Sequence, residues 1–228
     1  MAAPTPVATG ALATNTTTVT LPVVSPTCSV GDALICFLLN KQDVNAISAP
    51  DGDWTEIAQV DIGTSGRLAA FLRSSPDTGG TTYNFTKATD DNVLFIGVIQ
   101  AYTPATLDAT AAGTQTSGLA TDDVTYPGFD PTATENRTIF AAYYLNDLTT
   151  FSAAMSADTN PDCTIDFDLE TDVGLDASLA VTSGTNDGAT IDSRSWASNS
   201  TTNAGTGGLV FALVTSAAAD TLFAASAM

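Results

Sequence analysis

The stretch NVLFIGVIQAY at residues 92–102 decides the fold class, together with RTIFAAYYLN at residues 137–146. Both runs are apolar at successive positions and are rich in the β-branched and aromatic side chains that favour strands. A strand that is apolar on both of its faces is expected to be buried between two layers. We therefore predict that these two runs are central strands of an all-β protein.

Other short apolar runs recur along the chain, bounded by Gly, Pro, Asp and Asn, while helical periodicity is scarce. The stretches RLAAFLR (67–73) and TTYNFTK (81–87) are expected to be half-exposed. The spacing of the turn signals favours an antiparallel β-sandwich over alternating βα units. The predicted strands span residues 17–24, 33–40, 54–60, 67–73, 81–87, 92–102, 137–146, 163–169, 175–182, 190–197 and 207–215.

The expected organisation is one β-sandwich domain at 17–215, with a polar segment at each end. Residues 1–16 are predicted to form an extended N-terminal arm, and residues 216–228 a C-terminal arm or a short helix. Polar chain ends usually fray unless a partner holds them, so we expect neighbouring subunits to hold both arms. A long loop is predicted near 103–136; it is either a contact region or the sign of a missed strand near Leu107–Ala109.

The strongly negative net charge argues against several classes of binding partner. The chain has 228 residues, 44% of them hydrophobic, with 6 Lys+Arg against 25 Asp+Glu, a formal net charge of -19. Such a surface repels phosphate backbones and anionic lipid head groups, so neither nucleic acid nor a membrane is expected as a partner. The start of the sequence lacks the basic and apolar regions of a secretory signal, and no 18-residue apolar run predicts a membrane span.

The three cysteines, Cys28, Cys36 and Cys163, have no CxxC spacing. Synthesis in a reducing cytoplasm favours free thiols, and a Cys28–Cys163 disulfide stays open as the alternative. Cys36 lies inside the apolar run ALICFLL and is expected to fill core space.

Catalytic chemistry is scarce in this sequence. The chain has no histidine, which excludes Ser-His-Asp and Cys-His catalysis and histidine-ligated zinc. It also lacks the P-loop pattern, a GxGxxG fingerprint in a βαβ context and a GxSxG elbow. We predict no catalytic residues and no cofactor.

The stretch TIDFDLETDVGLD at 164–176 carries an acidic ladder. Its members are Asp166, Asp168, Glu170 and Asp172. If the stretch is one regular strand, these carboxylates share one face, with neighbours about 6.5–7 Å apart. The favoured interpretation is a strand face that meets solvent or another subunit. Calcium binding is a weaker hypothesis, since an EF-hand loop would fail at Thr171 and Ala177, and a catalytic carboxylate pair is the weakest.

Four residues are interaction candidates. Tyr126 and Phe129 lie in TYPGFDP (125–131) and look exposed, so they could stack on sugars or pack against a neighbour. The alternative is a loop that folds over its own core. Arg137 and Arg194 are rare cations in an acidic chain, and each is expected to pair with carboxylates, as are Arg67 and Arg73.

The turn DGDW (51–54) is predicted to be a tight hairpin turn, with Trp54 plugging the sandwich edge. Ligand binding by this acidic loop is the alternative.

The order of features at residues 30–102 resembles a jelly-roll-like β-sandwich module of tailed-bacteriophage virion proteins. The matching segments are VGDALICFLLN, SAPDGDWTEI, GRLAAFLRSS, PDTGGTTYNFT and NVLFIGVIQAY. The Gly-Trp turn of that pattern is interrupted here, because Asp53 lies between Gly52 and Trp54. The match covers about a third of the chain and supplies no active-site residue.

The resemblance implies a non-enzymatic structural virion protein, which we expect to be a capsid decoration (cement) protein on the outer surface of the particle. Its expected partners are the major capsid protein or other virion proteins, and copies of itself as a dimer or trimer. One alternative is a tail, fibre or adhesion module whose loops at 48–53 and 103–136 bind host carbohydrate, with or without calcium. Another is a carboxylate-based hydrolase.

Overall fold

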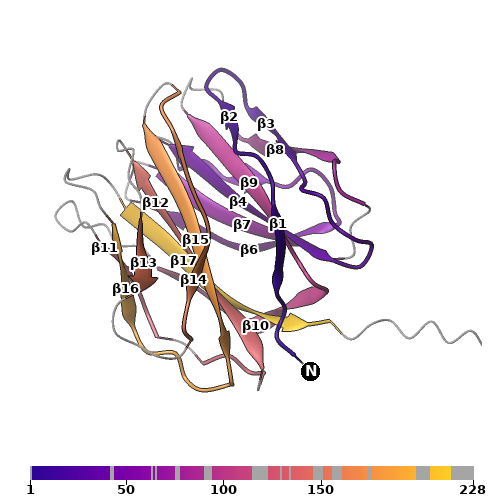
Figure 1. The fold of residues 1–228 in the computed structure, drawn as a ribbon. Coiled ribbons are helices and arrows are strands. Elements are labelled where there is room, and N and C mark those ends of the chain that lie inside the picture. The colour runs from indigo at the N-terminus through magenta and orange to yellow at the C-terminus, as the bar shows by residue number, and fades with distance from the viewer. Residues whose placement is uncertain are drawn as a thin grey trace, which may run out of the picture.

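The fold was determined as a computed structural model and is built from antiparallel strands (Figure 1). The structure describes residues 2–41, 44–62, 64, 66–74, 78–89, 94–114, 123–128, 130–133, 135–145, 151–155, 161–173, 176–198 and 206–216. None of these residues is helical, and no helix long and apolar enough to span a bilayer occurs among them.

The strands follow one another with no other regular element between them in the described part of the chain. They are β1 (Pro6–Thr9), β2 (Ala13–Asn15), β3 (Thr20–Val24), β4 (Ala33–Lys41), β5 (Ile47–Ser48), β6 (Trp54–Asp61), β7 (Gly66–Arg73), β8 (Thr82–Lys87), β9 (Phe95–Tyr102), β10 (Ala105–Thr114), β11 (Asp123–Tyr126), β12 (Asn136–Leu145), β13 (Phe151–Met155), β14 (Thr164–Thr171), β15 (Ala177–Asn186), β16 (Arg194–Ser198) and β17 (Thr206–Thr215).

These strands form four sheets. Sheet A has the order β1-β9-β4-β7-β6, with β2 also paired to β9, and sheet B has the order β3-β8-β5. Sheet C has the order β10-β17-β12-β15-β14, and sheet D has the order β11-β16-β13. The prediction of an all-β antiparallel sandwich is confirmed, whereas a jelly-roll connectivity is not established by these pairings.

The sheets stack in the order B, A, C, D, because three separate cores lie between them. Side chains of sheets A and C form the largest core, those of A and B a second, and those of C and D a third. In Figure 1, β3 and β8 lie on one side of this stack, and β11, β13 and β16 lie on the other. Sheets A and C are therefore covered on both faces.

Strand periodicity explains why one apolar run can serve two cores. In β4, Ile35 and Phe37 enter the core between A and C, whereas Leu34 and Cys36 enter the core between A and B. Successive side chains of a strand point to opposite faces, so a doubly covered strand must be apolar at every position. Strands β9 and β12 follow the same rule, which confirms that the two opening stretches are central strands.

The structure corrects three expectations about individual segments. The predicted long loop near 103–136 contains β10 and β11, so the alternative of a missed strand near Leu107–Ala109 is confirmed. RLAAFLR is buried rather than half-exposed, because sheet B covers the outer face of β7. Residues 1–16, expected as an arm, contribute β1 and β2 to the chain's own sheet A. Residues 217–228 of the predicted C-terminal arm lie outside the described residues.

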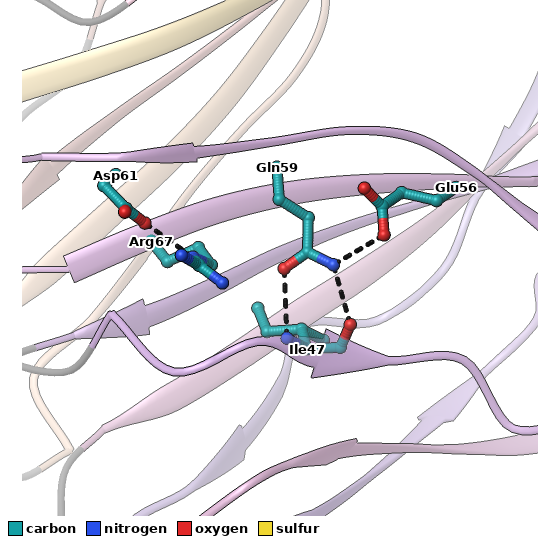
Figure 2. Close-up of polar contacts among 5 residues, drawn as sticks. All are labelled: Ile47, Glu56, Gln59, Asp61 and Arg67. Carbon is teal, nitrogen blue, oxygen red and sulfur yellow. Dashed lines mark hydrogen bonds and ion pairs between the residues drawn. The ribbon is translucent and has the colours of Figure 1, made fainter.

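The side chain of Gln59 joins sheet B to sheet A, because its amide makes the two hydrogen bonds that the backbone of a neighbouring strand would make (Figure 2). The Gln59 carboxamide of β6 accepts a hydrogen bond from the Ile47 N–H at 3.0 Å and donates one to the Ile47 carbonyl at 2.8 Å. Its second N–H bond goes to the Glu56 carboxylate at 2.8 Å. The amide thus satisfies both backbone groups of Ile47 in β5, the edge strand of sheet B.

Candidate functional site

Three members of the acidic ladder, Asp166, Asp168 and Glu170, lie on β14 at the edge of sheet C, and Asp172 follows the end of this strand. The strand is not regular. Ile165 and Phe167 face Thr182 and Val181, which are consecutive residues of β15, so Asp166 is the extra residue of a β-bulge. The bulge shifts the alternation by one position. The expectation that all four carboxylates share one face is therefore wrong for Asp166.

Asp166 points into the gap between the two central sheets. Its Oδ2 accepts a hydrogen bond from the Tyr102 hydroxyl of β9 at 3.1 Å, and Tyr102 belongs to the core between sheets A and C. Burial raises the pKa of Asp166, while hydrogen bonds from Ser183 and Tyr102 and the charge of Arg137 act in the opposite direction. The carboxylate joins the two sheets.

The other members of the ladder lie closer to water. Asp168 is half-buried opposite Ala180, which belongs to the core between sheets C and D, whereas Glu170 and Asp172 are exposed. Among the described residues, no three His, Cys, Asp or Glu side chains gather in a way that could hold a metal ion. In this region the ladder serves two purposes: one internal contact and an acidic strand edge.

Arg137 lies beside Asp166 and is largely buried. Its guanidinium donates to Ser183 Oγ at 2.9 Å and to Thr185 Oγ1 at 3.4 Å, both on the neighbouring strand β15. Its Nε–H is directed at the carbonyl of Pro4, which it binds. The predicted interaction residue therefore contacts the N-terminal segment of its own chain.

The N-terminal segment, defined as residues 2–9, crosses the edge of the stack at this point. Thr5 and Thr103 bind each other twice, through Thr5 N–H to Thr103 Oγ1 and Thr103 N–H to Thr5 O, both at 2.9 Å. Thr215, the last residue of β17, donates its hydroxyl to the Ala2 carbonyl. Sheets A and C thus both bind the segment, largely through its main chain.

Tyr126 is not exposed, and its position agrees with the alternative that this segment folds over its own core. It is completely buried, its hydroxyl donates to the Ala141 carbonyl at 3.0 Å, and its ring packs edge-on against Phe140 at 5.1 Å. Strand β11 lies over sheet C and faces inward at this position. Phe129 lies outside the described residues.

Arg194, the other predicted interaction cation, is also buried. Its guanidinium donates to the Pro161 carbonyl at 3.1 Å and lies over the Phe140 ring, with 5.2 Å between Cζ and the ring centroid. This side chain packs within the outer part of the stack and does not reach the surface.

The DGDW turn binds Arg73. Asp51 and Asp53 each lie 3.1 Å from the Arg73 guanidinium, and Arg67 pairs with Asp61 at 2.5 Å, as predicted for these two arginines. Trp54 is buried against Tyr83 and Phe85, so the prediction that it plugs the sandwich edge is confirmed. The prediction of a hairpin turn is wrong, because β5 and β6, which flank the turn, belong to different sheets.

The sequence does not predict the burial of several charged residues, among them Lys41 and Asp108. Lys41 ends β4 inside the stack, where its Nζ donates to the Asp176 carbonyl at 2.6 Å. Burial lowers the pKa of Lys41 to about 8, against the opposing effect of Asp176. Asp108 in β10 accepts N–H bonds from Thr132 at 2.8 Å and from Ala133 at 3.1 Å. A charge at the end of an otherwise apolar run was the only signal for Lys41.

The three cysteines are free thiols in the structure. Cys28 and Cys36 lie in the core between sheets A and B, whereas Cys163 packs against the core between C and D. Burial raises the pKa of Cys163 to about 11, which leaves little thiolate at neutral pH.

Comparisons with protein-family models, with curated proteins and with solved structures found no match for this chain. The fold and the site together define an acidic, four-layered, antiparallel β protein, in which the buried polar side chains described above join parts of the same chain.

Proposed function

We propose that this protein is a non-enzymatic structural component of a tailed-bacteriophage virion, and specifically a capsid decoration protein on the outer surface of the shell. The observation that carries the proposal is the position of the residues that resemble virion modules. The segments between residues 30 and 102 supply β4, β6, β7, β8 and β9, which include the four main strands of sheet A.

The contacts of individual residues in these segments support the resemblance to virion modules. Gly31 in the leading Gly-Asp pair adopts a φ of 98°, which glycine tolerates best, and Asp32 accepts the Ser29 N–H at 2.7 Å to close the turn before β4. The strand that ends in Arg73 places this arginine on the DGDW turn. The motif residues therefore build turns and a sheet rather than a site for a small molecule.

The charge and the polar contacts favour a structural role over a catalytic one. Arg137, Asp166 and Arg194 bind groups of their own chain. A net charge of -19 suits the outside of a particle rather than its genome. The partners in this proposal are the major capsid protein or another virion protein, together with further copies of this chain.

Immunogold electron microscopy of purified particles tests the proposal. An antibody raised against the purified protein should label intact capsids at many positions, and mass spectrometry of the same particles should detect the chain in many copies. Absence of the chain from purified particles would overturn the proposal, and labelling confined to the tail would move it to a tail role. A glycan array with the purified protein separates the adhesion alternative, since a decoration protein should show no specific sugar binding.

A further inference from the structure

The edge of sheet A that carries the N-terminal segment has the features of a strand-binding site. Strand β9 pairs with β1 through Pro6–Tyr102, Ala8–Ala101 and Thr9–Gln100, with an irregularity between Pro6 and Ala8. Thr9 also donates its hydroxyl to the Gln100 side chain. Figure 1 shows β1 lying along this edge, in front of β9.

The receiving side is held in place by contacts of its own. Arg137 is fixed by Ser183 and Thr185, and Tyr102 is fixed by Asp166, so the guanidinium Nε–H is aimed at the Pro4 carbonyl by residues outside the segment. A buried guanidinium directed at a main-chain carbonyl recognises an extended backbone and not a particular side chain.

Apart from Pro4, which is buried, the segment contributes little buried surface. The residues of β1 are mostly exposed, and Val7 is 46% exposed. Ala2, Pro4 and Thr5 are bound largely through their backbone groups. By contrast, Leu12 and Ala13 pack against the two cores that flank sheet A. The chain is therefore anchored from Leu12 onward. Gly10 donates its N–H to the Ile99 carbonyl of β9 at 2.8 Å, so it moves together with the segment, and the pivot falls at Ala11.

We propose that residues 2–9 exchange between copies, so that the segment of one copy pairs with β9 of a second copy and binds its Arg137. An exchanged segment makes every contact that it makes within its own chain, so copy concentration and spacing decide between the two states. This inference rests on the proposed function, because an ordered shell provides the high local concentration that favours exchange, and it names the second copy as the partner.

A disulfide exchange experiment tests the proposal in the full-length protein. Thr9→Cys and Gln100→Cys are made in a Cys163→Ser background, since the two native side chains are already in contact. The double variant at low concentration should form an intrachain disulfide, which verifies the register. The two single variants, one of them isotope-labelled, are then unfolded together, refolded at high concentration and oxidised.

Exchange predicts a labelled–unlabelled dimer joined through residues 9 and 100, with a yield that increases with protein concentration. The control is the mixture of Asp61→Cys with Arg67→Cys, a contacting pair within one hairpin, which should give no such dimer under the same conditions. A residue 9–100 dimer no more abundant than the control dimer would overturn the proposal, provided that circular dichroism shows both single variants folded. The disulfide experiment uses the purified protein and no particles. A negative result would therefore overturn the exchange of the segment without affecting the proposed capsid role, and a failure of the capsid role would not affect the disulfide result.

Discussion

The position of Asp166 depends on a β-bulge, which turns its carboxylate from the outer face of the strand to a contact between two sheets. In a regular strand it would share a face with Asp168 and Glu170, but the bulge places it against Tyr102. The sequence predicts the strand and its acidic character. It does not predict the bulge, because an extra residue in a strand pair depends on the partner strand β15 and not on the local pattern.

The raised pKa of Asp166 predicts a pH-dependent effect of the Asp166→Asn substitution. A carboxyl group whose pKa is higher in the folded state than in the unfolded state binds more protons when folded, so it contributes less stability as the pH rises. The change occurs between the unfolded pKa of about 3.9 and the higher folded value. Relative to the wild type, Asp166→Asn should therefore gain stability as the pH rises through this range.

Urea unfolding at a series of pH values from 4 to 8 measures this difference. Asp172→Asn provides the control, because it removes a carboxyl group at an exposed position outside the core. Parallel curves for the wild type and Asp166→Asn would contradict the predicted role of the buried carboxyl group.

Tyr143 carries a buried hydroxyl group that has no hydrogen-bond partner among the described residues. Tyr143→Phe removes an unsatisfied polar atom, so we expect the free energy of unfolding to stay equal or to rise by about 1 kcal/mol. The matched variant is Tyr126→Phe, which loses the bond to the Ala141 carbonyl and should cost about 1 kcal/mol. Chemical denaturation of both variants checks the opposite signs, and a clear loss at Tyr143 would show that its hydroxyl is bonded.

At the scale of the strand, burial on both faces decides how much the sequence can predict. Strands β4, β9, β12 and β17 were located closely, since apolar side chains occupy nearly every position between two cores. The short strands β1, β2 and β5 were missed, because strands of two to four residues give too short a pattern. The sequence ATLDATAAGT of β10 predicts a loop because its residues are small and polar, and only the alternative of a strand near Leu107–Ala109 points to β10.

The contact between the Gln59 amide and Ile47 predicts how substitution of Gln59 affects the stability of the sheet B edge. Gln59→Ala would leave both backbone groups of Ile47 without their partner, so we expect a loss of about 1–3 kcal/mol of stability. It would also open the β5 edge and so favour aggregation. Thermal unfolding and light scattering measure the two effects.

Gln59→Glu is the sharper test, because a carboxylate can accept the Ile47 N–H but cannot donate to the Ile47 carbonyl. It should lose stability, and the proximity of Glu56 should add to the loss. The control is Glu56→Gln, which keeps the Gln59–Ile47 pair and should stay close to the wild type. A wild-type value for Gln59→Ala would mean that water replaces the amide without cost.

For the whole molecule, the four-layer stack explains both the success and the limit of the sandwich prediction. Continuous apolar runs predict central strands that are covered on both faces, but they do not identify the strands of sheets B and D as the outer cover. Strand β8 alternates between exposed and buried positions, as an outer strand of an ordinary two-layer sandwich also would. The number of layers depends on which strands pair, and this is not encoded in the pattern of any single strand. The sequence predicts carboxylate partners for Arg137 and Arg194, whereas the structure shows their guanidinium groups donating to the main-chain carbonyls of Pro4 and Pro161, which lie outside the strands.

The net charge of -19 makes a prediction about salt. Like charges on a compact molecule repel one another, and the distance over which they do so falls from about 10 Å at 0.1 M salt to about 3 Å at 1 M. Sodium chloride should therefore stabilise the folded state, by about 1 kcal/mol or a few degrees in Tm between low salt and 0.5 M. Potassium chloride should act equally, because the effect is screening and not binding of a particular ion.

Calcium chloride at millimolar concentration and matched ionic strength is the decisive comparison. A larger gain in Tm with calcium than with magnesium would point to a specific calcium site, whereas equal gains fit screening. A Tm that does not rise with sodium chloride would contradict the idea that self-repulsion limits the stability of this acidic stack.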